Sequence, residues 1–295
     1  PPMHTIPAKT LLTRQKSPEY WFGADWNMNL YRGCPHGCIY CDSRSECYGN
    51  DDFDHVYAKE NALLLLRDEL RRKQHTGIVS TGAMSDPYNP HERTEQLTRG
   101  ALALFAEYGF GVTVITKSGL ICRDIDVLRA VKQHAPVLCK LTVTTADDAL
   151  ARRLEPHAPL PSARLEALAR LSEAGLPTCI LLMPVLPWLT DSTDSIRTLV
   201  RRAKEAGVHS IYPMWGLTLR DRQRAYFYQQ LDRTFPGLKR RYIERYGAAY
   251  QCAVPDARKL ERIFVQECEN NGILYKMQDI ISDYQAEQGG QLSLF

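Results

Sequence analysis

Short apolar runs alternate with amphipathic stretches along most of this chain. The runs are rich in β-branched residues and predict strands at 29–32, 77–82, 111–116, 137–144, 176–183 and 208–212. The intervening apolar residues recur at helical spacing and predict helices at 57–75, 92–108, 124–134, 147–154, 162–174 and 192–206. The chain is therefore expected to alternate strand and helix through most of its length.

This alternation is typical of parallel strands joined by right-handed crossovers and covered by helices. The predicted units are too few for a closed barrel of about eight strands, so the expected fold is α/β, an incomplete (β/α)6 barrel with a C-terminal helical extension. In such sheets the active site lies at the carboxyl ends of the strands.

Four zones follow from the pattern. An irregular lead-in occupies 1–26, the partial barrel 27–215, a basic and aromatic helical extension 216–284, and a flexible tail 285–295. No apolar stretch approaches the ~18 residues of a membrane span, and no signal pattern opens the chain. A cytoplasmic protein is expected, in which the nine cysteines are thiols or metal ligands rather than disulfides.

Three of these cysteines lie close together. Cys34, Cys38 and Cys41 are separated by three and then two residues. This spacing fits three irons of a cubane [4Fe–4S] cluster and leaves the fourth iron open to a small molecule. The alternative is a zinc site with His36 or Cys47 as fourth ligand, although no second pair of zinc-type ligands follows.

The motif, with the aromatic Tyr40 just before its last cysteine, resembles that of the radical S-adenosylmethionine (radical SAM) superfamily. The segments 85–88 (Ser-Asp-Pro-Tyr) and 116–118 (Thr-Lys-Ser) resemble the spore photoproduct lyase-like, or DNA repair photolyase-like, group. The resemblance implies a [4Fe–4S] cluster, S-adenosylmethionine (SAM), its cleavage to a 5′-deoxyadenosyl radical, and an electron donor such as flavodoxin or ferredoxin.

The same resemblance assigns roles to individual residues. It implies that Ser85 and Asp86 contact the aminoacyl group of SAM, that Lys117 lies near its carboxylate, and that Thr142 supplies a hydroxyl to the same ligand. The backbone at Tyr40 is expected to contact the adenine. Without the resemblance, 85–87 would be a turn or helix cap, Lys117 a solvated lysine at a strand end, and Thr142 a strand residue.

One departure from spore photoproduct lyase concerns the hydrogen donor. The family has a cysteine just before its Ser-Asp pair, whereas this chain has Ala83 and Met84, and a thioether carries no S–H. Cys47 and Cys252 are the candidate replacements, although free cysteines are usually small buried hydrophobes.

The zone after the barrel is basic. Between positions 216 and 260 the chain has ten Arg or Lys, four Asp or Glu, and seven Tyr or Phe. This combination suits a DNA-binding surface, and equally a solvated helix face with its aromatics packed inward. The net charge of the whole chain is only +3, which does not by itself indicate a polyanion partner.

The last five residues resemble the short peptide by which bacterial DNA polymerases and repair proteins bind the sliding clamp. Gln291 offers an amide, and Leu292, Leu294 and Phe295 can fill apolar pockets. The alternative is a frayed tail that docks on its own domain.

Three functional hypotheses remain at this point. The first is a radical SAM enzyme that repairs or modifies DNA and is recruited to the clamp. The second is a radical SAM enzyme acting on RNA, a peptide or a small molecule. The third is a non-catalytic metal-binding module associated with the clamp.

Overall fold

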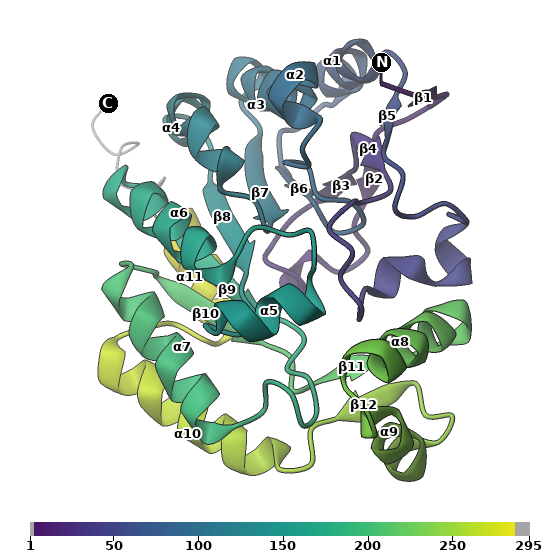
Figure 1. The fold of residues 1–295 in the computed structure, drawn as a ribbon. Helices are drawn as coiled ribbons and strands as arrows, with labels where there is room; N and C mark the ends of the chain where they lie inside the picture. The colour runs from purple at the N-terminus through teal and green to yellow at the C-terminus, as the bar shows by residue number, and fades with distance from the viewer. Residues whose placement is uncertain (1–2, 287–295) are drawn as a thin grey trace.

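A seven-stranded sheet forms the centre of the structure, a computed structural model that describes residues 3–286. The strand order is β10-β9-β8-β7-β6-β3-β2, and all neighbours are parallel except the edge strand β2 (Leu12–Arg14). The six parallel strands are β3 (Trp26–Met28), β6 (Ile78–Thr81), β7 (Gly111–Thr116), β8 (Val137–Thr142), β9 (Thr178–Leu182) and β10 (Ser210–Pro213). The sheet does not close on itself, which confirms the predicted partial barrel (Figure 1).

Helices between the strands cover one face of this sheet (Figure 1). They are α1 (Ala62–Arg72), α2 (Glu92–Glu95), α3 (Leu97–Tyr108), α4 (Ile125–Lys132), α5 (Asp148–Leu154), α6 (Pro161–Glu173) and α7 (Thr193–Glu205). Their apolar stripes bury residues such as Leu128, Leu168 and Leu199 in one large core with Val112 and Val114 of β7. This burial of apolar area stabilises the layer arrangement.

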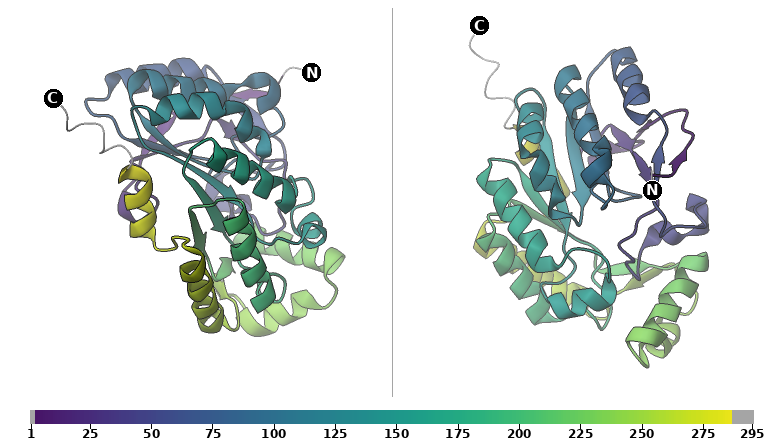
Figure 2. Two further views of the ribbon diagram at one scale, coloured as in Figure 1. Left: turned by 90° about the vertical axis from the view of Figure 1, so that its left-hand side faces the viewer. Right: turned by 45° about the horizontal axis from the view of Figure 1, so that its top comes forward.

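The C-terminal part of the chain returns to the barrel. Helix α10 (Ala257–Asn271) packs along α7, as Figure 2 shows, and α11 (Met277–Ala286) contacts β8. Tyr284 of α11, Phe22 from the N-terminal segment, and Leu181 of β9 form a separate core. The segment around Phe22 and helix α11 therefore fill the inner side of the partial barrel. No helix within residues 3–286 is both long and apolar enough to cross a membrane.

Two small sheets stand outside the barrel. Strands β1 (Thr5–Ile6), β5 (Tyr57–Lys59) and β4 (Tyr31–Arg32) form one, and β11 (Gly216–Thr218) pairs with β12 (Gln251–Ala253) in the other. Helices α8 (Asp221–Thr234) and α9 (Leu238–Tyr246) pack beside the second sheet.

The sequence-based elements need four corrections. The first barrel strand is 26–28 rather than 29–32. Residues 57–59 form β5 and only 62–72 is helical, because tertiary pairing overrides the local pattern. The predicted helix 92–108 is broken at Gln96, whose φ of 52° is left-handed, and the extension predicted as helical contains the strand pair β11–β12.

Candidate active site

The three cysteines of the motif open onto one cavity at the carboxyl ends of β6, β7 and β8. We call this the cysteine cavity. Its lining also includes residues that follow these three strands. The lining residues are Cys34, His36, Cys38, Cys41, Ser43, Phe53, Gly82, Ala83, Met84, Ser85, Asp86, Ile115, Thr116, Lys117 and Thr142. The structure thus brings together the cysteines and the predicted residues Ser85, Asp86, Lys117 and Thr142.

Close backbone contacts fix the cysteine loop, residues 33–41. Gly33 has a φ of +84°, and a Cβ there would lie 1.9 Å from the carbonyl oxygen of His55, so only glycine fits. The backbone N–H of Cys34 donates to the carbonyl oxygen of Phe53 at 2.8 Å. The Ser85 hydroxyl donates to the Gly33 carbonyl at 2.6 Å, which ties the loop to the end of β6.

Asp86 is the centre of a buried hydrogen-bond cluster. Its Oδ1 accepts from the Thr116 hydroxyl at 2.6 Å and the Tyr88 N–H at 2.9 Å. Its Oδ2 accepts from the Lys117 N–H at 2.8 Å and lies 2.9 Å from Nε2 of His36. Burial alone would raise the pKa of this carboxyl, but the bonds from His36, Lys117 and Thr116 lower it to about 2. Asp86 therefore joins the cysteine loop to β7 as a carboxylate.

His36 is the residue of the cysteine loop whose side chain bonds Asp86. It stands between Cys34 and Cys38, is only 4% exposed, and bonds Asp86 through Nε2. Its other ring nitrogen, Nδ1, is buried without a hydrogen-bond partner in the described chain. The sequence suggests His36 only as a zinc ligand. The sequence feature that could have predicted the contact with Asp86 is a histidine between two closely spaced cysteines, together with an aspartate at the end of a strand.

A second buried cluster anchors the other end of the loop. Glu155 accepts bonds from the Tyr40 hydroxyl and the Arg164 guanidinium. Arg164 also donates to the carbonyl oxygens of Thr142, at 3.0 Å, and Pro159, at 2.8 Å. Burial would raise the pKa of Glu155, but the charge of Arg164 brings it below its usual value. Neither Glu155 nor Arg164 carries a local sequence signal, because the pair forms only where the chain turns between α5 and α6.

Lys117 extends toward the cysteines. Its ammonium lies 5.8 Å from the centre of the Tyr40 ring, and residues 3–286 give it no carboxylate in ion-pair contact. Burial would lower the pKa of Lys117, but negative charge at Cys38 and on the Glu155 carboxylate raises it, so the side chain is a cation. A buried cation beside three thiols is suited to an anionic ligand in the same cavity.

Burial disfavours the charged form of two of the three thiols. Burial raises the pKa of Cys34 to about 12 and raises that of Cys38 as well. Within residues 3–286 no three His, Cys, Asp or Glu side chains converge on one metal ion. A cubane has a different requirement, because each thiolate binds a separate iron at a separate corner.

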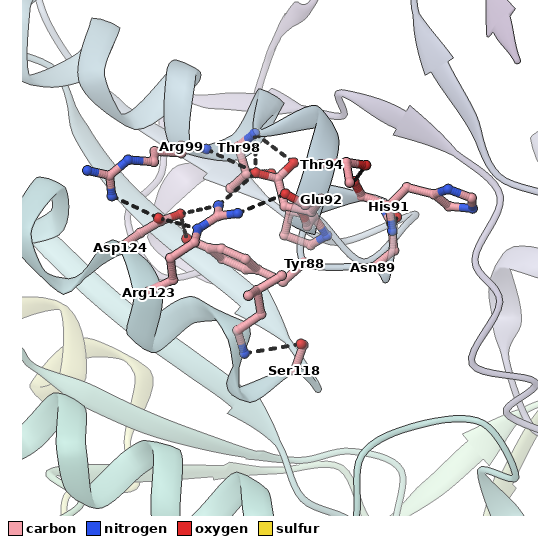
Figure 3. Close-up of polar contacts among 12 residues, drawn as sticks. Tyr88, Asn89, His91, Glu92, Thr94, Thr98, Arg99, Ser118, Arg123 and Asp124 are labelled. Carbon is pink, nitrogen blue, oxygen red and sulfur yellow. Dashed lines mark hydrogen bonds and ion pairs between the residues drawn. The ribbon is translucent and has the colours of Figure 1, made fainter. Parts of the chain in front are cut away.

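A hydrogen bond and a cluster of ion pairs hold Tyr88, two residues after Asp86 (Figure 3). The Tyr88 hydroxyl donates to Asp124 at 3.1 Å, and Arg123 bonds both Asp124, at 2.7 Å, and Glu92, at 2.9 Å. Glu92 and Asp124 are fully buried. The position of Asp86 is therefore set by α2, α3 and the turn before α4, as well as by its own strand.

The two cysteines predicted as hydrogen donors do not line the cysteine cavity. Cys47 is exposed on a short 3-10 turn, Glu46–Tyr48. Cys252 is buried on β12, in the core formed with Phe227 and Tyr242.

Several basic side chains of the C-terminal zone are already bonded to other groups of the protein. Arg220 bonds Asp42 at 3.0 Å and Ser45 at 3.0 Å, and Arg222 bonds the carbonyl oxygens of Arg44 and Asn50. Further pairs are Arg224 with Gly247 and Ala249, Lys239 with Asp232, and Arg240 with Glu244. Arg220 and Arg222 thus hold α8 against the segment 42–54 that follows the cysteine loop, whereas the other three pair within the C-terminal zone itself.

A family model described as the radical SAM superfamily matches residues 28–200. This chain belongs to the radical SAM superfamily. The matched span contains the cysteine loop, Asp86, Lys117, Thr142 and Glu155. As a radical SAM protein the chain is an enzyme whose cofactors are a [4Fe–4S] cluster and SAM, and it requires an electron donor. The side chains of the cavity suit both cofactors chemically, with three thiols for iron and one buried cation for a carboxylate.

Similar proteins occur in distant organisms. An uncharacterized protein of Mycobacterium tuberculosis strain H37Rv is 34% identical over 228 residues, which cover 75% of this chain and 67% of that protein. One from Methanocaldococcus jannaschii is 31% identical over 190 residues, 63% of this chain and 68% of that protein. These relatives support the superfamily assignment without specifying a substrate.

Solved structures of spore photoproduct lyase have the same fold. A mutant with bound AdoMet and dinucleoside spore photoproduct has a TM-score of 0.65 at 14% identity, over 90% of this chain and 79% of that chain. Another mutant has a TM-score of 0.67 at 15% identity, over 90% and 78%. The predicted lyase-like radical SAM fold is confirmed.

Proposed function

We propose that this radical SAM enzyme repairs or modifies DNA in the cytoplasm. The observation that carries the proposal is the cysteine cavity, where the three thiols meet Lys117 at the open ends of a sheet with the fold of spore photoproduct lyase. One of the spore photoproduct lyase structures holds a bound dinucleoside photoproduct, which supports a nucleic-acid substrate here.

In this proposal Cys34, Cys38 and Cys41 hold the cluster. The bound cluster and SAM supply a 5′-deoxyadenosyl radical. Lys117 binds the SAM carboxylate as a cation, and Thr142 offers it a hydroxyl. Tyr40 contacts the adenine through its backbone, while its side chain is fixed by Glu155.

Ser85 and Asp86 act on the same ligand largely by positioning. Their side-chain oxygens already bond Gly33, Thr116 and Lys117, so they keep the cysteine loop and β7 in register around the cavity. SAM binding therefore depends on the arrangement they hold.

The fate of the product radical must differ from that in spore photoproduct lyase. Met84 lines the cavity where that family has a cysteine, and its thioether has no S–H to give. Cys47 and Cys252 are the remaining candidates in this chain, and each would need a movement of its segment to reach the cavity.

The experiment is an assay of SAM cleavage on anaerobically reconstituted enzyme. Release of 5′-deoxyadenosine should rise when damaged or undamaged DNA is added, and it should not rise with RNA or peptide. The Cys34→Ala, Cys38→Ala, Cys41→Ala triple variant should release none. Stimulation by RNA or peptide instead of DNA would overturn the substrate assignment while keeping the radical SAM chemistry.

We also propose that the tail recruits the enzyme to a sliding clamp. Residues Gln291, Leu292, Leu294 and Phe295 lie outside the described part of the chain, so this proposal depends on the peptide pattern alone. A tether raises the local concentration on DNA and would allow weak intrinsic DNA affinity. A labelled 289–295 peptide should bind the clamp of its own host saturably, and a peptide with Leu294→Ala and Phe295→Ala should not. Equal binding by both peptides would contradict the proposal.

A further inference from the structure

A second cavity, of about 490 Å³, adjoins the cysteine cavity. The two share four lining residues, Ser43, Phe53, Met84 and Ser85. The second cavity lies between β6 and the small sheet β1-β5-β4, which stands beside β3 in Figure 1. A molecule held there would reach the cysteine cavity past Met84.

The charge of this second cavity is positive. Arg32 and Lys59 line it, and no Asp or Glu is among its lining residues. Lys59 is half-buried, and no carboxylate of residues 3–286 forms an ion pair with its ammonium. Burial lowers the pKa of Lys59, and Glu69, which opposes the shift, already accepts from the N–H groups of Leu11 and Leu12. A partly desolvated cation without a paired anion favours an anionic ligand.

The remaining lining adds an amide and aromatic surface. Oδ1 of Asn29 is buried with no hydrogen-bond partner in the described chain, although a buried amide normally has one. Phe53 and Tyr48 also line this cavity, and an arginine lies over each ring, Arg44 at 5.0 Å from Phe53 and Arg220 at 5.3 Å from Tyr48. Amide side chains pair with the edges of nucleobases, aromatic rings stack on their faces, and Arg and Lys bind phosphate.

We propose that this cavity binds one nucleotide of the substrate, with Lys59 and Arg32 on a phosphate and Asn29 on the edge of the base. The inference rests on the proposed DNA substrate and specifies how it is held. The volume lies within the ~300–1,000 Å³ of ordinary ligand pockets and is too small for a duplex. The target nucleotide must therefore leave its stack or come from a single strand.

The test is equilibrium binding of 2′-deoxynucleoside 5′-monophosphates to the reconstituted enzyme in the presence of SAM. The matched nucleosides and ribonucleotides serve as comparison ligands. The monophosphate should bind at least about tenfold more tightly than its nucleoside, a difference of about 1.4 kcal/mol. Lys59→Gln should remove this difference, Lys59→Arg should restore it, and Asn29→Leu should weaken both ligands. Lys9→Gln, which changes an exposed lysine elsewhere on the N-terminal segment, should bind like the unaltered enzyme.

Equal affinity for nucleotide and nucleoside would overturn the phosphate site, as would a Lys59→Gln variant that binds the nucleotide normally. Preference for ribonucleotides would contradict the DNA assignment. Failure of the radical SAM proposal would appear separately, as absence of SAM cleavage in the unaltered enzyme. The two failures are therefore distinguishable.

Discussion

Lys140 is a charged residue in an apolar place. It is fully buried on β8, its ammonium bonds the Thr113 hydroxyl at 3.1 Å, and it lies 4.2 Å from the centre of the Phe22 ring. Burial lowers its pKa to about 7, against a small opposing effect of Cys179. In the unfolded chain Lys140 has an ordinary lysine pKa of ~10.4. Between pH 7 and this value the lysine is therefore protonated in the unfolded chain and mostly neutral in the folded protein. Lys140 therefore destabilises the fold at neutral pH, and stability should rise as the pH increases from about 7 toward ~10.

Replacing Lys140 with methionine should stabilise the protein at pH 7. The lowered pKa of Lys140 corresponds to a loss of stability on the order of 4 kcal/mol, which the substitution would remove. Leaving the Thr113 hydroxyl without a partner would cost about 1–2 kcal/mol, so the net gain in the free energy of unfolding is about 2–3 kcal/mol. Urea unfolding of Lys140→Met should also lose the rise in stability between pH 7 and 9. A variant less stable than the unaltered protein at pH 7, with the same pH slope, would show that Lys140 has a partner that offsets its burial.

At the residue scale, the sequence was informative where chemistry is encoded locally. Two sequence features were enough to predict that these residues share one cavity. They are the spacing of Cys34, Cys38 and Cys41 and the position of Lys117 directly after a strand. The pairing of His36 with Asp86 and of Glu155 with Arg164 could not be predicted, because each depends on how separate elements approach in space.

Segment 42–54 and α8 form one unit at the scale of elements. Arg220 joins them through Asp42, Ser45 and Tyr48, and Gln223 donates from α8 to the Tyr40 carbonyl at 3.2 Å. The predicted helices and strands of the barrel were mostly correct because their periodicity is strong. The short strands β5, β11 and β12 were missed because a three-residue strand has almost no periodicity and is defined by its partner.

Removing the guanidinium of Arg220 should loosen this unit. Arg220→Gln is expected to speed amide hydrogen exchange in 42–54 by about tenfold, as expected for losing a partly exposed charge-assisted bond. Exchange in β7 and β8 should stay unchanged. Arg240→Gln, which breaks an exposed pair within α9, is the control and should leave 42–54 as it was. Equal exchange in 42–54 for both variants would show that Arg220 does not hold the segment.

At the scale of the whole molecule, Glu155 connects the cysteine loop to β8 and α6 in the middle of the barrel. This carboxylate links Tyr40 in the loop with Arg164 on α6, and Arg164 holds the end of β8 at Thr142. All four residues are buried. The cavity is thus built by segments from the first, middle and later parts of the barrel.

Glu155→Gln should therefore destabilise the entire fold. It leaves the buried Arg164 guanidinium without its charge partner, and breaking such a pair costs about 3–5 kcal/mol. Urea unfolding measures the loss, with Glu173→Gln on the exposed face of α6 as the control. A loss below about 1 kcal/mol would mean that water or a neighbouring group compensates Arg164.

The central claim is that the cysteine cavity holds the cluster and SAM together. The most direct measurement is electron paramagnetic resonance of the reduced, reconstituted enzyme with and without SAM. We predict a [4Fe–4S] signal that SAM perturbs, the same signal in Lys117→Ala with a SAM response only at higher concentration, and no signal in Cys38→Ala. Losing a charge-assisted bond should weaken SAM binding in Lys117→Ala by about 1.5–3 kcal/mol. A cluster signal that is unchanged by saturating SAM, or that persists in Cys38→Ala, would contradict the account.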